Sequence, residues 1–347
     1  MADGGRLLVV DLRSTAEAFA LPDRVAEAIL AATPAGWRTY IVASLTDSFG
    51  DGAQAPSEEA LLAVRDAEVY VGFGMPRALF LAGPRLRWVQ TGTAGVATLL
   101  YAEIRDGDVL LTNAAGLYGP SIAEYVVGGV LHFLRAFDLA AVMRQARVWD
   151  QGAFATARAM VREVDECAVL VIGAGGLGSE VARRFRALGA RVTGVRRRPE
   201  LGLPEGFAAV HGPDALDRLL PEADVIVLAT PLTDETRRVL SAARIARLRP
   251  GAIVCNVARG ALVDERALAA ALQEGRIRGA VLDVFEREPL AADSPLWHLE
   301  RVLQTPHVSG VSPRRFWDRF QDLLLDNWAR YRAGTPLRNV VDKRAGY

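Results

Sequence analysis

The amino-acid sequence predicts an α/β protein built from two doubly wound parallel-sheet domains. Its 347 residues favour two domains over one. Short apolar runs alternate with helical patterns along the chain, as in parallel sheets whose strands are joined by helices. A glycine-rich turn, GAGGLG at 173–178, lies between such a run and a helical pattern near mid-chain. This setting indicates that one of the two domains is a Rossmann dinucleotide-binding domain.

The first α/β series occupies the first third of the chain. A long helix is predicted after it, over about 120–146, where Ser121 and Glu124 form a Ser-x-x-Glu pattern typical of a capping box. Because this helix is apolar on most faces, we expect it to be buried between domains or subunits. The strands of this first series are predicted at RLLVVDL (6–12), TYIVAS (39–44), VYVGF (69–73), LRWVQT (86–91) and VLLTNA (109–114).

The second α/β series starts at the strand before the glycine-rich turn. A final helix is predicted over about 313–332, with large apolar residues along one side. The strands of this series are predicted at AVLVIGA (168–174), ARVTGVR (190–196), ADVIVLAT (223–230), AIVCNVA (252–258), GAVLDVF (279–285) and RVLQTP (301–306).

Composition excludes several classes of function. The formal net charge is zero, so nothing indicates binding to nucleic acid or to an acidic membrane surface. The most apolar stretch, YVVGGVLHFL (125–134), is too short to span a bilayer, and the N-terminus is interpreted as a first strand rather than a signal peptide. Cys167 and Cys255 lie in apolar runs and are expected to be buried free thiols, consistent with a cytoplasmic protein.

The basic residues and histidines narrow the chemistry further. Lys343 is the only lysine, so a P-loop lysine, a Schiff-base lysine and a Tyr-x-x-x-Lys relay are absent from the body of the chain. The four histidines are scattered and no Cys/His spacing suggests zinc, so no metal is predicted. Catalysis therefore has to use arginine, histidine, carboxylates or hydroxyls.

The glycine-rich turn predicts dinucleotide binding. Gly173 makes the tight turn, Gly175 lets a pyrophosphate approach the backbone, and Gly178 lets the helix pack on the strand. Gly176 and Leu177 stand at the start of the helix, where free N–H groups bind phosphate oxygens. A tight turn without a ligand is the alternative, but the strand–turn–helix setting favours a dinucleotide.

The end of the next strand indicates which dinucleotide is bound. An acidic residue near position 196 would accept a hydrogen bond from a free ribose 2′-hydroxyl and repel a 2′-phosphate. The chain carries Arg196, Arg197 and Arg198 there instead, and a guanidinium binds phosphate bidentately. NADP(H) is therefore predicted through Arg196 and Arg197, with NAD(H) bound less tightly. A solvated basic turn is the alternative.

Three further stretches fall at the ends of strands in the second series: CNVARGALVDE (255–265), LDVFEREP (282–289) and TPHVSG (305–310). Ligands bind at the carboxyl ends of parallel strands, so Arg259, Glu288 and His307 are expected to converge at the nicotinamide end of the cofactor. Taken separately, Arg259 could be a surface arginine, Glu288 a loop carboxylate and His307 a capping histidine. The other strand-end residues predicted to contact the cofactor are Thr230, Pro231, Val257 and Ala258.

Together, these motifs resemble the D-isomer-specific 2-hydroxyacid dehydrogenase family. The similarity includes TPLTDETR (230–237), TGTAGV (91–96) and TNAAGLYGPSIAEYV (112–126), and it covers nearly the whole chain. The arginine-rich turn is similar to that of the glyoxylate/hydroxypyruvate reductase branch, which favours NADPH. The resemblance implies a flavodoxin-like substrate domain, residues 1–115 completed by 311–347, an NADP-binding Rossmann domain, residues 116–310, and a homodimer joined through the cofactor domain.

The resemblance also implies roles for individual residues. Arg259 matches the arginine that grips the substrate carboxylate and polarises the keto oxygen, and His307 matches the proton donor to that oxygen. Glu288 matches the carboxylate paired with the histidine, and Asp283 an aspartate near the nicotinamide ring. The backbone N–H groups that would hold the other side of the carboxylate are those of Ala94, Gly95 and Val96.

Elementary chemistry supports the same roles. Hydride transfer to a 2-keto acid builds charge on the keto oxygen, so a proton donor must lie within hydrogen-bond reach. A carboxylate partner raises a histidine pKa, and a planar arginine can fork across two oxygens. Two departures from the family pattern, Ala97 in place of Asp and VREVDEC (161–167) before the first strand of the second series, leave the subfamily open.

We therefore expect an NADPH-preferring reductase of a small 2-keto acid such as glyoxylate or hydroxypyruvate. The alternatives are the same chemistry on a larger apolar keto acid, phosphite oxidation, and a nucleotide-sensing corepressor that acts through protein partners. Formate dehydrogenases carry Gln in place of the paired glutamate, so Glu288 argues against them. Phe73, Met75 and Tyr118 are weak candidates for pocket walls, because such residues more often belong to the core.

Overall fold

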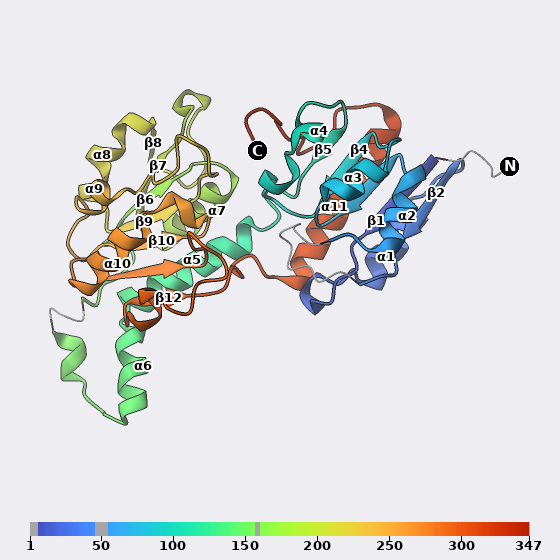
Figure 1. Ribbon diagram of the computed structural model, residues 1–347. Helices are drawn as coiled ribbons and strands as arrows, with labels where there is room; N and C mark the ends of the chain where they lie inside the picture. The colour runs from blue at the N-terminus through green and yellow to red at the C-terminus, as the bar shows by residue number, and fades with distance from the viewer. Residues whose placement is uncertain (1–5, 46–54, 157–159, 347) are drawn as a thin grey trace. The chain divides into compact units, whose positions relative to one another are not determined.

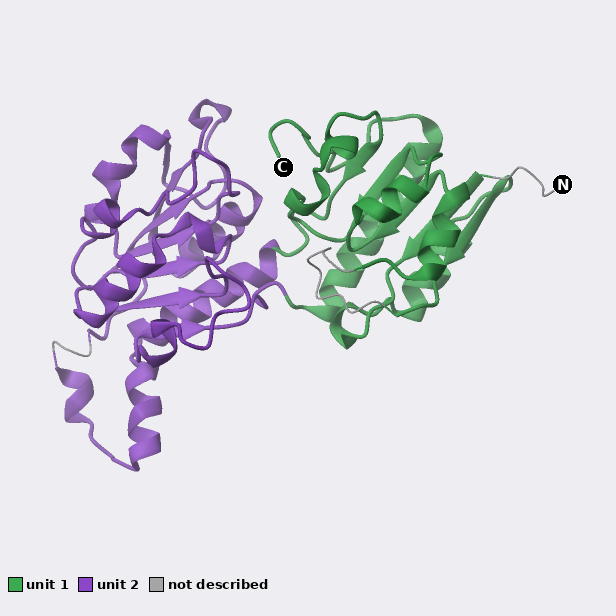
Figure 2. Ribbon diagram, in the orientation of Figure 1, with its two compact units in different colours: residues 1–118, 311–347 green, residues 119–310 purple. Residues whose placement is uncertain are grey.

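The computed structural model describes residues 6–45, 55–156 and 160–346. The chain divides into two compact units, coloured separately in Figure 2. Unit 1 combines 1–118 with 311–347, and unit 2 is 119–310. Each unit is a parallel sheet with helices on both faces, so the predicted α/β class with two parallel-sheet domains is confirmed.

Unit 1 holds a sheet of five parallel strands within the described residues, in the order β2-β1-β3-β4-β5 (Figure 1). Chain order reverses between β1 and β3, which places a topological switch point at the carboxyl ends of these strands. The strands are β1 (Arg6–Asp11), β2 (Trp37–Ile41), β3 (Val69–Gly72), β4 (Trp88–Thr91) and β5 (Leu110–Thr112). The helices are α1 (Asp23–Ala31), α2 (Glu58–Ala63), α3 (Arg77–Ala82), α4 (Ala102–Arg105) and α11 (Pro313–Ala333).

Alternating side chains of the unit 1 strands feed two separate cores. Leu8 and Val10 of β1 pack with α1 and with the aromatic face of α11, whereas Leu7 and Val9 pack with α2, α3 and α4. This period of two is the geometry of a strand that is covered on both faces. The C-terminal helix α11 is therefore an integral part of the first unit, although it is far from it in sequence.

Unit 2 holds a larger sheet, in which the structure describes seven parallel strands in the order β12-β11-β10-β9-β6-β7-β8. The switch point lies between β6 and β9. The strands are β6 (Ala168–Ile172), β7 (Arg191–Val195), β8 (Ala209–His211), β9 (Val225–Leu228), β10 (Ile253–Asn256), β11 (Gly279–Leu282) and β12 (Val302–Gln304). The helices are α5 (Gly119–Leu134), α6 (Phe137–Ala146), α7 (Gly176–Ala187), α8 (Leu216–Leu219), α9 (Ala242–Ile245) and α10 (Glu265–Gln273).

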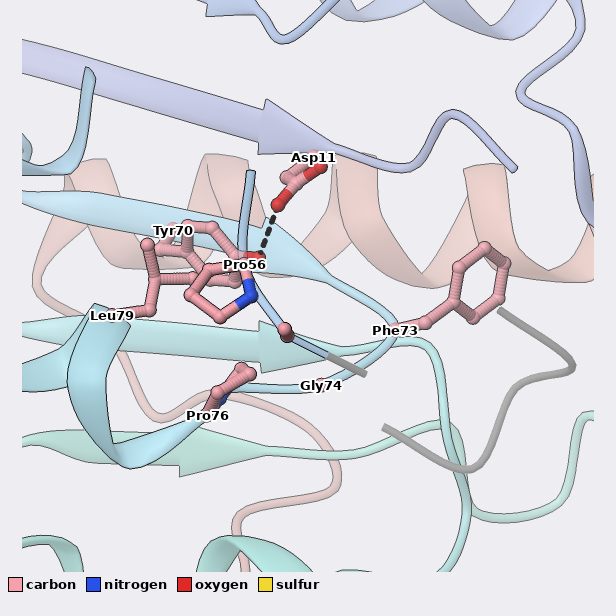
Figure 3. Close-up of a pocket in the computed structure, with 8 residues that line it drawn as sticks. Asp11, Pro56, Tyr70, Phe73, Gly74, Pro76 and Leu79 are labelled. Carbon is pink, nitrogen blue, oxygen red and sulfur yellow. Dashed lines mark hydrogen bonds between the residues drawn. The ribbon is translucent and has the colours of Figure 1, made fainter. Parts of the chain in front are cut away.

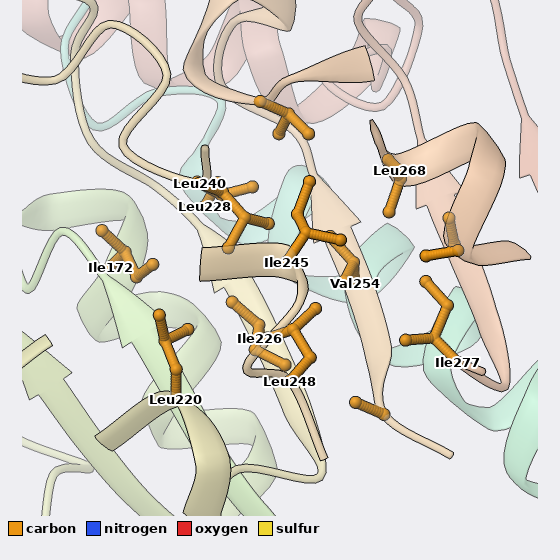
Figure 4. Packing of buried hydrophobic residues seen from close by; sticks show 14 of the residues in the cluster. Ile172, Leu220, Ile226, Leu228, Leu240, Ile245, Leu248, Val254, Leu268 and Ile277 are labelled. Carbon is orange, nitrogen blue, oxygen red and sulfur yellow. The ribbon is translucent and has the colours of Figure 1, made fainter. Parts of the chain in front are cut away.

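The two faces of the unit 2 sheet also carry separate cores. One face packs against α8, α9 and α10, and Figure 4 shows part of this cluster, including Ile226 and Val254 of the central strands. The other face packs against α5 and α7. Burial of both faces explains why these strands appear in the sequence as continuous apolar runs.

The helix predicted over 120–146 is in fact two helices. It breaks after Leu134, where Ala136 takes a left-handed conformation with φ 53°. The capping-box prediction is wrong: the helix starts at Gly119, two residues before Ser121, whose hydroxyl donates to the carbonyl of Ser309. Several α5 residues are buried, but against the sheet and α7 of their own unit, and none of the α6 residues is buried.

Among the helices that the structure describes, none is by itself long and apolar enough to span a bilayer. Only α5 and α6 together reach that length and composition, and the pair is bent by 63° at its break.

Candidate functional site

The turn between β6 and α7 forms a cradle that only glycine can form. Gly173 has φ +111°, and a Cβ there would lie 2.5 Å from the carbonyl carbon of Ala229. A Cβ at Gly178 would lie 2.0 Å from the carbonyl oxygen of Gly173. At Gly175, by contrast, a Cβ would meet nothing within 4 Å, and no side chain caps the helix start. This open space at a bare helix N-terminus fits a dinucleotide pyrophosphate.

Two of the three arginines after β7 differ in their surroundings. Nη2 of Arg196 donates to the carbonyl of Gly202 at 2.5 Å and to that of Pro199 at 3.5 Å, so this side chain shapes its own turn. Arg197 is exposed, and its charge contributes to the lowered pKa of Glu235, which results mainly from a hydrogen bond donated by Thr233. Arg197 is therefore close to the loop after β9 and is the more accessible cation.

His307 and Glu288 form a hydrogen-bonded pair, with Nδ1 of the imidazole 2.9 Å from Oε2 of the carboxylate. The backbone N–H of Phe285 donates to the other oxygen, Oε1, at 3.0 Å. The hydrogen bond to Glu288 raises the pKa of His307 above its ordinary value, although burial and the charge of Arg259 oppose this. Burial raises the pKa of Glu288, but the contacts with His307, Phe285 and Arg259 outweigh burial and lower it.

The loop that carries His307 is held by Asp283. His307 has a left-handed backbone, φ 56°, and its N–H donates to the carbonyl of Asp283 at 2.8 Å. The carboxylate of Asp283 accepts from the Thr305 hydroxyl at 2.6 Å and from the N–H groups of Val308 at 2.8 Å and Ser309 at 3.0 Å. Its side chain is completely buried, so the structure shows it engaged with the loop.

Tyr125 of α5 extends this network, because its hydroxyl lies 2.7 Å from the Thr305 hydroxyl. Thr305 and Tyr125 were not predicted from the sequence. Thr305 begins the quoted stretch TPHVSG, but a threonine beside a strand end has no pattern that distinguishes it from other loop threonines.

Arg259 follows β10 and is exposed. Its Nη1 donates to the carbonyl of Ala258 at 2.6 Å, and Asn256 Nδ2 holds the carbonyl of Arg259 at 2.8 Å. Although the side chain is exposed to solvent, desolvation by the surrounding loops lowers the pKa of Arg259, while the charge of Glu288 raises it. A Cβ at Gly260 would lie 1.8 Å from the carbonyl carbon of Phe285, so the loops carrying Arg259 and Glu288 pack directly together.

The remaining predicted cofactor residues lie on the same edge of the sheet. Thr230 and Pro231 follow β9, and the N–H of Thr230 is next to the Gly173 turn. Val257 is buried and Ala258 is half-buried between β10 and Arg259. The structure thus brings the glycine turn and the Arg259, Glu288 and His307 loops to the carboxyl edge of one sheet.

The predicted carboxylate loop belongs to unit 1, at the end of β4. Asn113 Nδ2 donates to the carbonyl of Ala94 and the Thr93 hydroxyl to that of Gly95, both at 2.8 Å. Among the described residues, the N–H groups of Ala94, Gly95 and Val96 donate to no acceptor in the chain. A loop whose carbonyls accept side-chain hydrogen bonds while its N–H groups have no acceptor in the chain is suited to binding an anion.

Two of the three weak candidates for pocket walls belong to the core, and one of them, Phe73, also lines a small cavity next to Asp11. Phe73 and Met75 are 2% and 1% exposed, and Phe73 packs within the aromatic cluster of α11. Tyr118 is half-buried; it stacks on Phe316 of that cluster, and its hydroxyl donates to the carbonyl of Gly92 at 2.7 Å.

Residues 127–309 match the family model described as D-isomer specific 2-hydroxyacid dehydrogenase, NAD binding domain. The chain belongs to this family of NAD(P)-dependent oxidoreductases, which act on small 2-hydroxy and 2-keto acids, and its cofactor is a nicotinamide dinucleotide. The predicted family is confirmed.

The similar proteins include enzymes with different substrates. The chain is 34% identical to (S)-sulfolactate dehydrogenase of Chromohalobacter salexigens over 73% of this chain and 80% of that protein. It is 32% identical to glyoxylate/hydroxypyruvate reductase A of Salmonella newport over 78% of this chain and 85% of that protein. The NADPH-dependent glyoxylate/hydroxypyruvate reductase of Sinorhizobium meliloti, solved with NADP and sulfate, superposes with a TM-score of 0.76 at 28% identity, covering 99% of this chain and 100% of that chain.

Proposed function

We propose that this protein is an NADPH-preferring reductase of small 2-keto acids of the glyoxylate and hydroxypyruvate type. The observation that carries the proposal is the His307–Glu288 pair, in which Nδ1 lies 2.9 Å from Oε2. The loop that carries Arg259 packs directly against the loop that carries Glu288. This arrangement offers a proton and a cation at one sheet edge, which is what reduction of a keto group next to a carboxylate requires.

A dinucleotide held at the Gly173–Gly178 turn would supply the hydride for this reduction. Arg259 binds the substrate carboxylate and stabilises the charge that develops on the keto oxygen. His307 holds its Nδ1 proton toward Glu288, which leaves Nε2–H as the donor to that oxygen. Glu288 keeps the imidazole charged and oriented. The N–H groups of Ala94, Gly95 and Val96 are proposed to bind the substrate carboxylate as well.

The preference for NADP(H) is proposed from the turn after β7. Arg197 is exposed and Arg196 keeps its own turn in shape, and both present positive charge at the strand end where the ribose is bound in this fold. A 2′-phosphate gains charge-assisted hydrogen bonds there, whereas a free 2′-hydroxyl gains little. A similar reductase solved with NADP and a similar 2-hydroxyacid dehydrogenase solved with NADPH support this preference.

We also propose a homodimer that is joined through the cofactor domain. No residue of α6 is buried, Phe137 at its start is 56% exposed, and Trp149 just beyond it is 90% exposed. An exposed apolar segment of this kind is typical of a surface that a second copy covers. The concentration dependence of the molar mass, with Trp149→Arg as the variant, tests this: the variant should be monomeric where the wild type is dimeric.

The function itself is tested by turnover. Wild-type protein is assayed with NADPH and with NADH on glyoxylate, hydroxypyruvate and an apolar acid such as 2-ketohexanoate. The proposal predicts higher kcat/KM for the two small acids and for NADPH. Preference for 2-ketohexanoate would favour a reductase of larger apolar acids. NADPH binding without turnover of any keto acid would favour a nucleotide-sensing protein and overturn the proposal.

A further inference from the structure

Asp11, at the end of β1, carries a buried carboxylate oxygen without a partner. Its Oδ2 accepts a hydrogen bond from the Tyr70 hydroxyl at 2.9 Å. Its Oδ1 is buried and has no hydrogen-bond partner within the described residues, and the residue as a whole is only 7% exposed. A buried acceptor left unpaired is costly, and native proteins rarely keep one without a reason.

Asp11 lines a small cavity in unit 1, shown in Figure 3. Its volume of about 10 Å³ is enough for one group of the size of a water molecule. Five of the lining residues have apolar side chains and one is a glycine, so Asp11 and Tyr70 supply its polar side-chain groups. The lining residues are Asp11, Ala55, Pro56, Tyr70, Phe73, Gly74, Pro76 and Leu79.

The cavity lies along the same sheet edge as the proposed carboxylate loop. The strand order is β1-β3-β4, and the segments after β3 and β4 are joined by hydrogen bonds from Gly92 N–H to the Gly72 carbonyl at 2.8 Å and from the Thr91 hydroxyl to the Phe73 carbonyl at 3.1 Å. Two strand spacings of about 4.8 Å separate β1 from β4. A molecule bound at Ala94–Val96 would therefore need a chain of about four carbons to reach Asp11, with a hydrogen bond at each end.

The charge around the cavity selects the kind of terminal group. Burial raises the pKa of Asp11, the Tyr70 hydrogen bond lowers it, and the charge of Glu59 raises it again. Glu59 itself is engaged by Tyr40, Ala43 and Ser44 and stays ionised, with a pKa of about 2. A hydroxyl or ammonium group is thus favoured beside Asp11, and a second carboxylate is disfavoured.

We propose that Asp11 is a specificity-determining residue, which accepts a hydrogen bond from a donor group at the far end of a four-carbon 2-keto acid. The inference rests on the proposed function, because it places the substrate carboxylate at Ala94–Val96. It extends the substrate class from glyoxylate and hydroxypyruvate, which are too short to reach Asp11, to acids such as 4-hydroxy-2-ketobutyrate.

Three probes of nearly equal length test the proposal. 4-Hydroxy-2-ketobutyrate ends in a donor, 2-ketopentanoate in a methyl group and oxaloacetate in a carboxylate. Wild type should prefer the hydroxyl over the methyl probe by roughly tenfold or more in kcat/KM, as for a hydrogen bond to a charged group. Asp11→Asn keeps the shape and can keep the Tyr70 contact, but its NH₂ group then faces the cavity.

The variant should therefore lose the preference for the hydroxyl probe and gain relative activity on oxaloacetate, while glyoxylate turnover is unchanged. Such a reversal cannot come from general damage to the fold. Tyr70→Phe, which keeps the carboxylate, should keep the hydroxyl preference, and Asp23→Asn, an exposed change in the same unit, should behave as wild type.

Calorimetric titration of the NADP⁺-loaded protein with the same probes gives the comparison without turnover. If wild type reduces no keto acid but binds the hydroxyl probe in an Asp11-dependent way, the proposed function fails and the specificity assignment stands. If the activity ratios and the affinity ratios among the three probes are the same in Asp11→Asn as in wild type, the cavity holds only a water molecule and the assignment is overturned.

Discussion

Glu288→Gln keeps the size of the side chain beside His307 but removes its negative charge. The hydrogen bond to Glu288 raises the pKa of His307, so the imidazolium is populated below this pKa and lost as pH rises through it. Reduction uses the charged form, and its rate should fall along that limb. In the variant the burial of His307 and the charge of Arg259 remain, and both lower the pKa. The falling limb should therefore move to lower pH.

The size of the shift follows from the exposure of the pair. Hydrogen bonds to charged groups contribute about 1.5–3 kcal/mol. The side chains of His307 and Glu288 are 49% and 38% exposed, so solvent screening places this pair at or below the lower end of that range. Since about 1.4 kcal/mol equals one pKa unit, the limb should move by up to about one pH unit. At pH values above the falling limbs of both proteins, the variant should be up to about tenfold slower than wild type. At pH values below both limbs, the two rates should differ little.

The assay is a pH–rate profile from about pH 5.5 to pH 9, in which NADPH oxidation is followed at saturating cofactor and keto acid. Glu286→Gln is the matched control, because Glu286 is two residues away and pairs with Arg238. Its profile should coincide with that of wild type. A Glu288→Gln limb at the wild-type position would refute the coupling of Glu288 to the His307 proton.

Two further substitutions test the remaining cations. Arg259→Lys keeps the charge but loses the planar fork, so kcat/KM for keto acids should fall roughly tenfold to a hundredfold with NADPH affinity intact, whereas Arg238→Lys should have little effect. Near-normal turnover of Arg259→Lys would exclude the carboxylate grip. Arg197→Ser should weaken NADPH binding roughly tenfold to a hundredfold and leave NADH binding unchanged. The control is the same substitution at Arg191, which is exposed at the other end of β7. Equal losses for both cofactors would argue against a phosphate contact.

The strands and the glycine turn could be predicted because their physics is local. A strand buried on both faces appears as a continuous apolar run, and the steric need for glycine at positions 173 and 178 leaves a fixed spacing. β8 was missed because it is only three residues long and all three are only half-buried. The break at Ala136 left no signal, since alanine is a strong helix former and is held in the left-handed region by its surroundings alone.

The start of α5 shows how two local rules compete. Ser121 and Glu124 match a capping box, but Pro120 precedes them, and proline is favoured in the first turn of a helix. The helix begins at Gly119, Ser121 turns to Ser309, and Glu124 pairs with Arg184 of α7 instead of the backbone. A pattern over four residues could not predict these contacts, because both partners are distant in sequence.

Asp283 has a structural role that the resemblance does not indicate. The sequence places it at a strand end, and the resemblance implies an aspartate near the nicotinamide ring. In the structure its carboxylate accepts three hydrogen bonds from the loop that carries His307, whose left-handed backbone costs on the order of 1–3 kcal/mol. These bonds offset that cost and fix the imidazole beside Glu288 before any substrate binds. The chemistry that we propose for His307 therefore depends on a buried carboxylate that need not touch the reacting atoms, and on Thr305 and Tyr125, whose contacts could not be predicted from the motifs that contain them.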